Sequence, residues 1–190
     1  MTILLIGLVL FLGVHSVSIF ALPWRDAVVA RHAVLFKAGY GILSLVGLLL
    51  IIDGYGHSRL ENAPLWAAPG FMRHLVALLM LPVFICFFAS YFPGRIKTAL
   101  KHPQLVAVKL WAFSHLLVNS ALPDLILFGS FLAWAVVDRI SMKRRPVREP
   151  VLTAPASGLN DILLVVVGLT GYAGFAFWGH LALIGVYPFG

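Results

Sequence analysis

"HPQLVAVKLWAFSHLLVNS", residues His102–Ser120, is apolar enough over most of its length to cross a bilayer, yet it contains Lys109, His115 and Asn119. Hydrocarbon tolerates such side chains only when they find partners, so their presence points to a function. The whole chain has the same character: 61% of its 190 residues are hydrophobic and 11% are charged, and the mean hydropathy is +0.99. Soluble domains are about half apolar and about a quarter charged. The composition therefore predicts an integral membrane protein.

Six segments approach the roughly 20 apolar residues that a bilayer-spanning helix needs. They cover residues 2–21, 37–55, 71–91, 104–120, 124–140 and 159–182. The first lacks the basic region of a secretory signal, which favours a retained helix. We therefore expect an all-α bundle of six transmembrane helices forming a single domain over residues 1–190. The alternative is one long helix kinked at Pro123, which would leave five spans.

Basic residues alternate between the loops of this arrangement. The odd-numbered loops and their edges hold 12 of the 14 Lys and Arg residues, and only Arg59 and Arg73 fall in the even-numbered loops. Positive loops stay cytoplasmic, so we expect both termini to face the periplasm of a bacterial inner membrane. A five-span chain would place the basic "DRISMKRRPVRE" outside. The segment "PVREPVLTAPAS" is typical of a linker. Because the charges form no single patch, nucleic acid is excluded as a partner.

Two histidines lie well inside the predicted spans. His15 is past the middle of the first span, counted from the outer side, and His115 is past the middle of the fourth, counted from the cytoplasmic side. At 1.5 Å per residue their depths agree within about two helical turns. Two histidines at one depth on different helices can hold a cofactor, and in a membrane bundle haem is the common occupant, since a bare transition metal usually needs more ligands. The alternative is that each imidazole donates to a carbonyl group.

Helical spacing adds candidates for the lining of such a pocket. Trp111, His115 and Asn119 recur at every fourth position and share one helix face, as do Phe11 and His15. Aromatic rings suit a flat apolar cofactor, while Asn119 would bond a propionate, a substrate or a neighbouring backbone group. Lys109 lies near the cytoplasmic end of its span, where it either extends to the interface or contacts a haem propionate.

The remaining features favour structural roles. His57, His74 and His180 all fall on the outer side, but without the spacing of a metal motif we expect no shared metal there. Cys86 has no second cysteine to pair with, and we expect a small core residue. Small residues recur in the last span at Gly168, Gly171 and Gly174, which favours close helix packing.

Taken together, these segments resemble the NnrU family of bacterial membrane proteins. The resemblance rests on "LGVHS" at residues 12–16, "SLVGLLLIIDGYGHSR" at 44–59, "PLWAAPGFMRHLVALLM" at 64–80, the opening segment, and "LFGSFLAWAVVDRISMKRR" at 127–145. It implies an association with nitric oxide and nitrite reduction in denitrifying bacteria. The family is similar to the zeta-carotene isomerases, which are haem b proteins, and the two haem-binding histidines of those enzymes correspond here to His15 and His115.

Two departures bear on the activity that the resemblance implies. The isomerases have a cysteine ligand three residues before the second histidine, where this chain has Ala112, and their "HSG" is "HSV" here. Isomerisation of a carotene is thereby called into question, even if the chain binds haem. Three functions remain open: a haem-dependent redox enzyme or isomerase acting on a hydrophobic small molecule, a non-enzymatic accessory factor for nitrogen-oxide respiration, and a small-molecule transporter.

Overall fold

The computed structural model describes residues 1–146 and 155–189, and its regular structure within these ranges is entirely helical. The expected all-α class is therefore confirmed. Most of the predicted linker, residues 147–154, lies outside the described part. The helices form two compact units: Met1–Leu65 with Ala121–Arg145, and Trp66–Ser120 with Pro146–Gly190. Each unit is described by itself.

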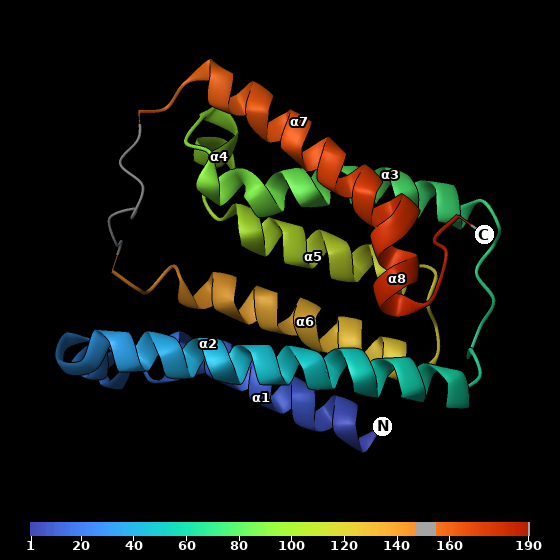
Figure 1. The fold of residues 1–190 in the computed structure, drawn as a ribbon, viewed down its shortest axis with the longest axis horizontal. Helices are drawn as coiled ribbons and strands as arrows, with labels where there is room; N and C mark the ends of the chain where they lie inside the picture. Colours follow the sequence, from blue (N-terminus) through green and yellow to red (C-terminus); the bar gives the residue numbers. More distant parts are fainter. Residues whose placement is uncertain (147–154, 190) are drawn as a thin grey trace. The chain divides into compact units, whose positions relative to one another are not determined.

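The first unit consists of α1 (Thr2–Phe20), α2 (Leu22–Glu61) and α6 (Leu122–Ser141). The α6 helix contacts both α1 and α2, and all three are labelled in Figure 1. The α2 helix is 40 residues long and kinks at His32, where the backbone leaves the helical region (φ −138°, ψ 51°). The sequence predicted a loop before residue 37, but this segment is helical because it contains no glycine or proline after Pro23 that would interrupt it.

Glycines bring α1 and α2 into close contact. A Cβ atom on Gly54 would lie 2.3 Å from the backbone nitrogen of Leu4, and one on Gly7 would lie 2.7 Å from that of Ile51. Gly47 approaches the backbone of Phe11 in the same way, at 2.8 Å. Gly47 and Gly54 are seven residues apart and so lie on one helix face. This contact fixes the position of Phe11 along the α2 axis, and therefore also that of His15, which lies one turn later on α1.

The second unit is built around α3 (Met72–Phe88), which contacts both α5 (Pro103–Leu116) and α7 (Gly158–Gly174). The short helix η1 (Ala89–Tyr91) extends α3, and the π-helical turn η2 (Phe175–Gly179) joins α7 to α8 (His180–Ile184). Cys86 lies in the core with Val83 and Ala107, so its predicted structural role is confirmed.

Close packing in α7 is confirmed for two of the three predicted glycines. A Cβ atom on Gly168 would lie 2.5 Å from the Ile85 side chain of α3, and one on Gly171 would meet the Phe84 ring at 3.2 Å. Gly174 has open space around it. An unpredicted helix, α4 (Arg95–Leu100), begins where the Asp161 carboxylate of α7 accepts hydrogen bonds from the Arg95 and Ile96 N–H groups.

The fourth and fifth predicted spans have other boundaries in the structure than the sequence predicted. The α5 helix stops at Leu116 instead of residue 120, and α6 begins at Leu122 with Pro123 in its first turn. Pro123 therefore starts a helix, as a proline at the first turn favours, and the chain is not one long helix kinked there. The first, third and sixth segments lie close to the predicted bounds, at α1, α3 with η1, and α7 through α8.

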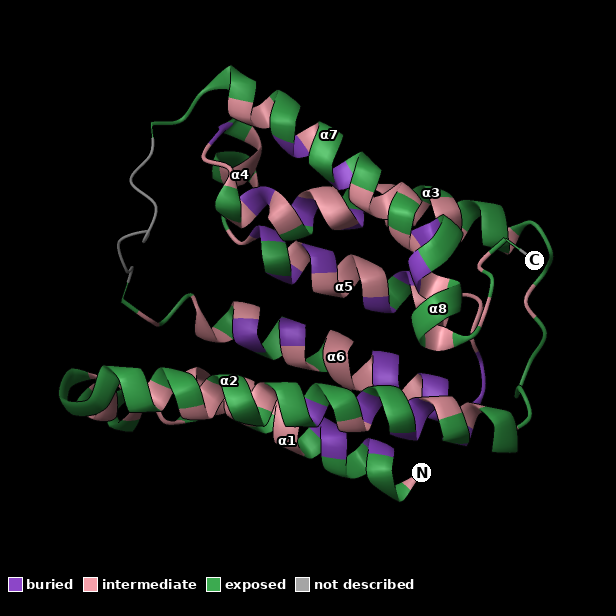
Figure 2. Ribbon diagram, viewed as in Figure 1, coloured by how far each residue is buried: buried purple, intermediate pink, exposed green. Residues whose placement is uncertain are grey.

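Four helices of the described residues are long and apolar enough to cross a membrane: α1, α2, α3 with η1, and α7 through α8. The α5 helix has only 14 residues, and α6 contains Asp124, Asp138 and Arg139. Large apolar side chains face outward on the long helices, with Val9 75% and Ile42 62% exposed, whereas Leu4 and Leu164 are fully buried. Figure 2 shows these exposed stretches in green. Helices that are apolar all round are typical of a protein surrounded by lipid, and this chain is a membrane protein.

Candidate functional site

His15 lies on α1 in the first unit, among aromatic rings. Its imidazole stacks on Phe11, one turn earlier, with ring centroids 4.2 Å apart, and its Nδ1–H donates to the Phe11 carbonyl at 2.7 Å. A histidine whose Nδ1 carries the proton has its lone pair on Nε2, the nitrogen that is left to bind a metal. The predicted pairing of Phe11 with His15 is confirmed, and the imidazole is oriented by it.

Two further rings from other helices contact His15, and the sequence did not predict either. Tyr40 of α2 has its ring centroid 5.1 Å from that of His15, and Trp134 of α6 meets the imidazole at a right angle at 6.0 Å. Phe131 of α6 packs on Phe11 at 5.6 Å. The signal in the sequence was the aromatic spacing within "FLAWAVVD", which places Phe131 and Trp134 on one side of a helix.

A buried ion pair lies next to this cluster. Asp138, one turn after Trp134, is 6% exposed and accepts a hydrogen bond from the Arg145 guanidinium, which also bonds the Ser141 hydroxyl. The Asp138 carboxylate is near enough to His15 and Tyr40 to interact electrostatically with both. A buried carboxylate is tolerated when it is paired. The ion pair with Arg145 therefore allows Asp138 to be buried as a charged group.

His115 lies on α5 in the second unit and makes the same Nδ1 bond as His15, but its ring is tilted against Trp111 where His15 is stacked on Phe11. Its Nδ1–H donates to the Trp111 carbonyl, one turn earlier, at 2.9 Å, and the two ring centroids are 5.4 Å apart. The predicted pairing of Trp111 with His115 is therefore confirmed. Because the same nitrogen is protonated, the lone pair of this imidazole also lies on Nε2.

Asn119 is near His115, but not for the predicted reason. The sequence placed it on the helix face of Trp111 and His115, whereas α5 ends at Leu116. Asn119 instead caps the helix: both its backbone N–H, at 2.9 Å, and its side-chain Nδ2, at 3.0 Å, donate to the His115 carbonyl. It fixes the backbone of His115 through one of its two Nδ2–H groups, and a bond to a neighbouring backbone group is one of the three roles predicted for Asn119.

Lys109 is half-buried on α5, six residues before His115. Six residues on an ideal helix rotate the side chain by about 120° relative to the starting direction. Lys109 therefore leaves α5 in a different direction from His115, and it makes no hydrogen bond or ion pair within the described part of the chain. Both roles predicted for it stay predictions.

The three histidines that the sequence predicts on the outer side lie in different settings. His57 donates from Nδ1 to the Asp53 carbonyl at 2.9 Å, but its side chain is 73% exposed. His180 donates to the Val186 carbonyl at 2.7 Å, and His74 is exposed. Among residues 1–146 and 155–189, no three His, Cys, Asp or Glu side chains gather as a metal-binding group.

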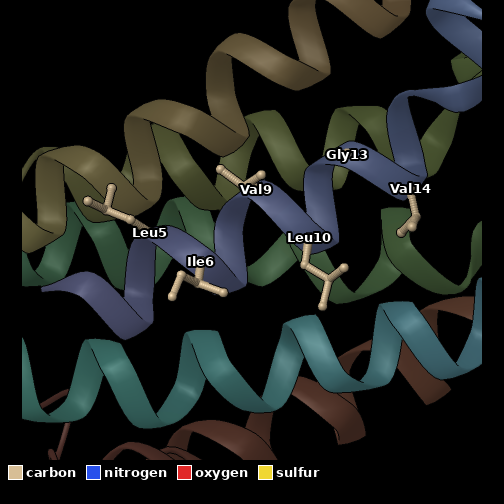
Figure 3. Close-up of a pocket in the computed structure, with 6 residues that line it drawn as sticks. All are labelled: Leu5, Ile6, Val9, Leu10, Gly13 and Val14. Atoms are coloured by element: carbon tan, nitrogen blue, oxygen red, sulfur yellow. The ribbon is translucent and has the colours of Figure 1, made fainter.

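Figure 3 shows a hollow along α1, lined by Leu5, Ile6, Val9, Leu10, Gly13 and Val14. It is open on one side, and its lining is almost wholly apolar. A hollow without polar groups cannot orient a substrate or carry out chemistry. The two histidine sites are therefore the better candidates.

Comparison with known proteins supports one assignment. No characterised protein and no solved structure matched the chain. A family model described as "NnrU protein" matches residues 3–188, nearly the whole length. The chain therefore belongs to the NnrU protein family.

Proposed function

We propose that this protein is an integral membrane haem b protein in which His15 and His115 are the two axial ligands of one iron. Membership in the NnrU family supports a membrane protein linked to nitric oxide reduction and denitrification. The site supports the more specific statement about haem. His15 belongs to the first unit and His115 to the second.

The observation that carries the proposal is the geometry that the two histidines share. Both donate from Nδ1 to the carbonyl four residues earlier, at 2.7 and 2.9 Å, and both contact the aromatic ring of that same residue. A backbone carbonyl on Nδ1 is the usual second partner of a metal-binding histidine, because it fixes the ring and increases the basicity of Nε2. Apolar rings beside the imidazole suit a porphyrin and exclude water.

His57 shows what the shared geometry adds beyond a simple backbone bond. It makes the same Nδ1 bond to the carbonyl four residues earlier, yet it is 73% exposed. His15 and His115 are both partly buried and packed on rings. Burial and aromatic contact together distinguish the two proposed ligands from a helix histidine that only satisfies its own backbone.

The proposal includes six transmembrane helices, with both termini in the periplasm of a bacterial inner membrane. Four of these helices have the length and composition of a span, and α5 and α6 supply the other two. The arrangement is favoured by the basic residues, because 12 of 14 fall in or beside loops that it makes cytoplasmic.

Within this proposal, the haem supports redox chemistry or isomerisation of a hydrophobic molecule. The thiolate route of the related isomerases is absent, because Ala112 occupies the position of the thiol and is fully buried, and Cys86 is part of the core of the second unit. A non-enzymatic role in nitrogen-oxide respiration remains the alternative. Turnover of a lipid-soluble substrate by the purified protein separates the two.

Visible spectra of the detergent-purified protein, oxidised and reduced, test the haem proposal. We expect a Soret band with the signature of a six-coordinate, low-spin iron. His115→Ala should lose the haem, and His15→Ala should bind it weakly or give a five-coordinate, high-spin spectrum. His57→Ala is the matched control and should keep the wild-type spectrum. If His15→Ala and His115→Ala both retain the full band, the two histidines are structural and the proposal is wrong.

A further inference from the structure

The indole N–H of Trp134, on the α6 face that meets His15, is buried without a hydrogen-bond partner among the described residues. Leaving a donor buried and unpaired is unfavourable, because the group has lost its hydrogen bond to water and gained none in return. Native proteins therefore rarely do so without a bound group or a water molecule to accept the bond.

Two other buried side-chain atoms of the described residues share this condition, the hydroxyls of Ser58 and Ser114. A serine hydroxyl in a helix can rotate toward the carbonyl one turn earlier. The indole has no such freedom, since its N–H is fixed in the ring plane and can only donate. Trp134 is therefore the stronger indication of a missing acceptor.

A second donor lies beside the same histidine. The Tyr40 ring is 5.1 Å from His15, and its hydroxyl makes no hydrogen bond to any residue that the structure describes. Tyr40 and Trp134 come from α2 and α6 and both contact the His15 ring. Two donors from different helices thus lie beside one imidazole. The Trp134 N–H is buried and lacks an acceptor, while the Tyr40 side chain is only half-buried.

The nearby charges do not supply that acceptor. Asp138 is the carboxylate nearest in sequence to Trp134, and it is already paired with Arg145. On the other side, Arg25 lies over the Phe36 ring at 5.8 Å and pairs with Asp26 at 2.8 Å. The remaining wall is formed by Phe11 and Phe131. The surroundings of His15 therefore combine apolar rings with two donors and paired charges.

We propose that Trp134 Nε1–H and the Tyr40 hydroxyl donate hydrogen bonds to a carboxylate of the group bound at His15. The inference rests on the proposed function: the group is then haem b, and the carboxylate is one of its propionates. Haem b is apolar apart from its propionates, which are its only strong acceptors at the edge. Hydrogen bonds to an ionised acceptor are stronger than neutral ones, so these two residues anchor the polar edge of the haem.

The test compares two ligands that differ only at this edge. Full-length protein, produced without haem and held in lipid nanodiscs, is titrated with ferric haem b and with its dimethyl ester, which lacks the charged acceptors. We expect Trp134→Phe and Tyr40→Phe each to weaken binding of haem b by about tenfold or more. Their effect on binding of the ester should be less than about threefold.

The controls remove the same groups elsewhere. Trp178→Phe changes an indole that is 75% exposed, and Tyr91→Phe changes a tyrosine that is 59% exposed. Both should leave the affinity for either ligand unchanged. The two test variants act on separate helices, so if Trp134→Phe does not fold, Tyr40→Phe still decides the matter.

Four results would overturn the inference. If the test variants lost affinity equally for haem b and for its ester, Trp134 and Tyr40 would act through the shape of their rings alone. If both variants bound haem b as tightly as the wild type, a water molecule, and not a propionate, would accept the hydrogen bonds from Trp134 and Tyr40. A wild-type protein that binds the ester as well as haem b would mean that no carboxylate is recognised, although the haem proposal would stand. Failure to bind either ligand would remove both proposals together.

Discussion

At the scale of single residues, the first unit contains a carboxylate that apolar surroundings should reject. Asp124 is 4% exposed, yet it accepts hydrogen bonds from the Tyr55 hydroxyl at 2.7 Å and from the Ala121 N–H at 2.8 Å. It lies in the first turn of α6, where the helix dipole favours a negative charge. Asp124 therefore fixes the start of α6 and ties it to α2.

Removing the Tyr55 hydroxyl should destabilise the protein. Tyr55→Phe leaves the buried Asp124 carboxylate with one bond fewer, at a cost of about 1–3 kcal/mol. Thermal unfolding in detergent should show a clear drop in Tm for this variant. Tyr91→Phe, at an exposed tyrosine, should unfold at the wild-type temperature. Equal Tm values for Tyr55→Phe and the wild type would show that the pair contributes nothing to stability.

The sequence predicted the residues that lie within one helical turn of a histidine, and missed those that tertiary packing supplies. Phe11 and Trp111 followed from a four-residue spacing, which is a local property of a helix. Tyr40 is 25 residues from His15 along the chain, and Trp134 is much farther. Both meet His15 only through the packing of α2 and α6. Asn119 was identified as a neighbour of His115, but it caps the helix where a face position was expected.

At the scale of helices, the contact between α1 and α2 depends on glycine. The backbones approach so closely that a Cβ atom on Gly54 would overlap Leu4 of α1. Without a hydrophobic effect between helices in lipid, close van der Waals contact is a main source of attraction. This contact also holds α1, and therefore His15, against α2.

Adding one methyl group at this contact should separate the helices. We expect Gly54→Ala to destabilise the protein by about 1–3 kcal/mol, because the nearest neighbours of the new Cβ atom are backbone atoms of Ile3 and Leu4, which cannot move aside. Gly56→Ala is the matched control on the same helix, since nothing lies within 4 Å of its Cβ position. Thermal unfolding measures both. If Gly54→Ala is as stable as Gly56→Ala, the close contact is not required.

The helices themselves were largely predictable because apolar length is a direct signal of a span. The boundaries at the membrane surface were harder. Residues 22–36 are helical on both sides of the kink at His32 despite Arg25 and Arg31, since charge does not prevent helix formation. The α4 helix depends on the Asp161 carboxylate of α7, a partner 65 and 66 positions away along the chain. No local pattern reveals such a partner.

At the scale of the whole molecule, two features of the sequence lead to different topologies. The basic residues favour six spans, because 12 of 14 then fall in or beside loops that this topology would make cytoplasmic. Helix length and composition identify only four spans among the described residues. The 14 residues of α5 give about 21 Å of helix, less than the roughly 30 Å of hydrocarbon. The turn between α5 and α6 distinguishes the two arrangements, because it is periplasmic with six spans and cytoplasmic with four.

Cysteine labelling at that turn should decide the topology. In a Cys86→Ser background, Leu122→Cys places a thiol at a side chain that is 48% exposed, at the start of α6. We expect a membrane-impermeant maleimide added to intact cells to label it, as it should label His57→Cys on the outer side. Lys143→Cys, at an exposed residue after α6, should react only in opened cells, because positive loops remain inside. If Leu122→Cys behaves like Lys143→Cys, then α5 and α6 do not cross the bilayer, and His115 lies on a helix that enters from the cytoplasm and returns.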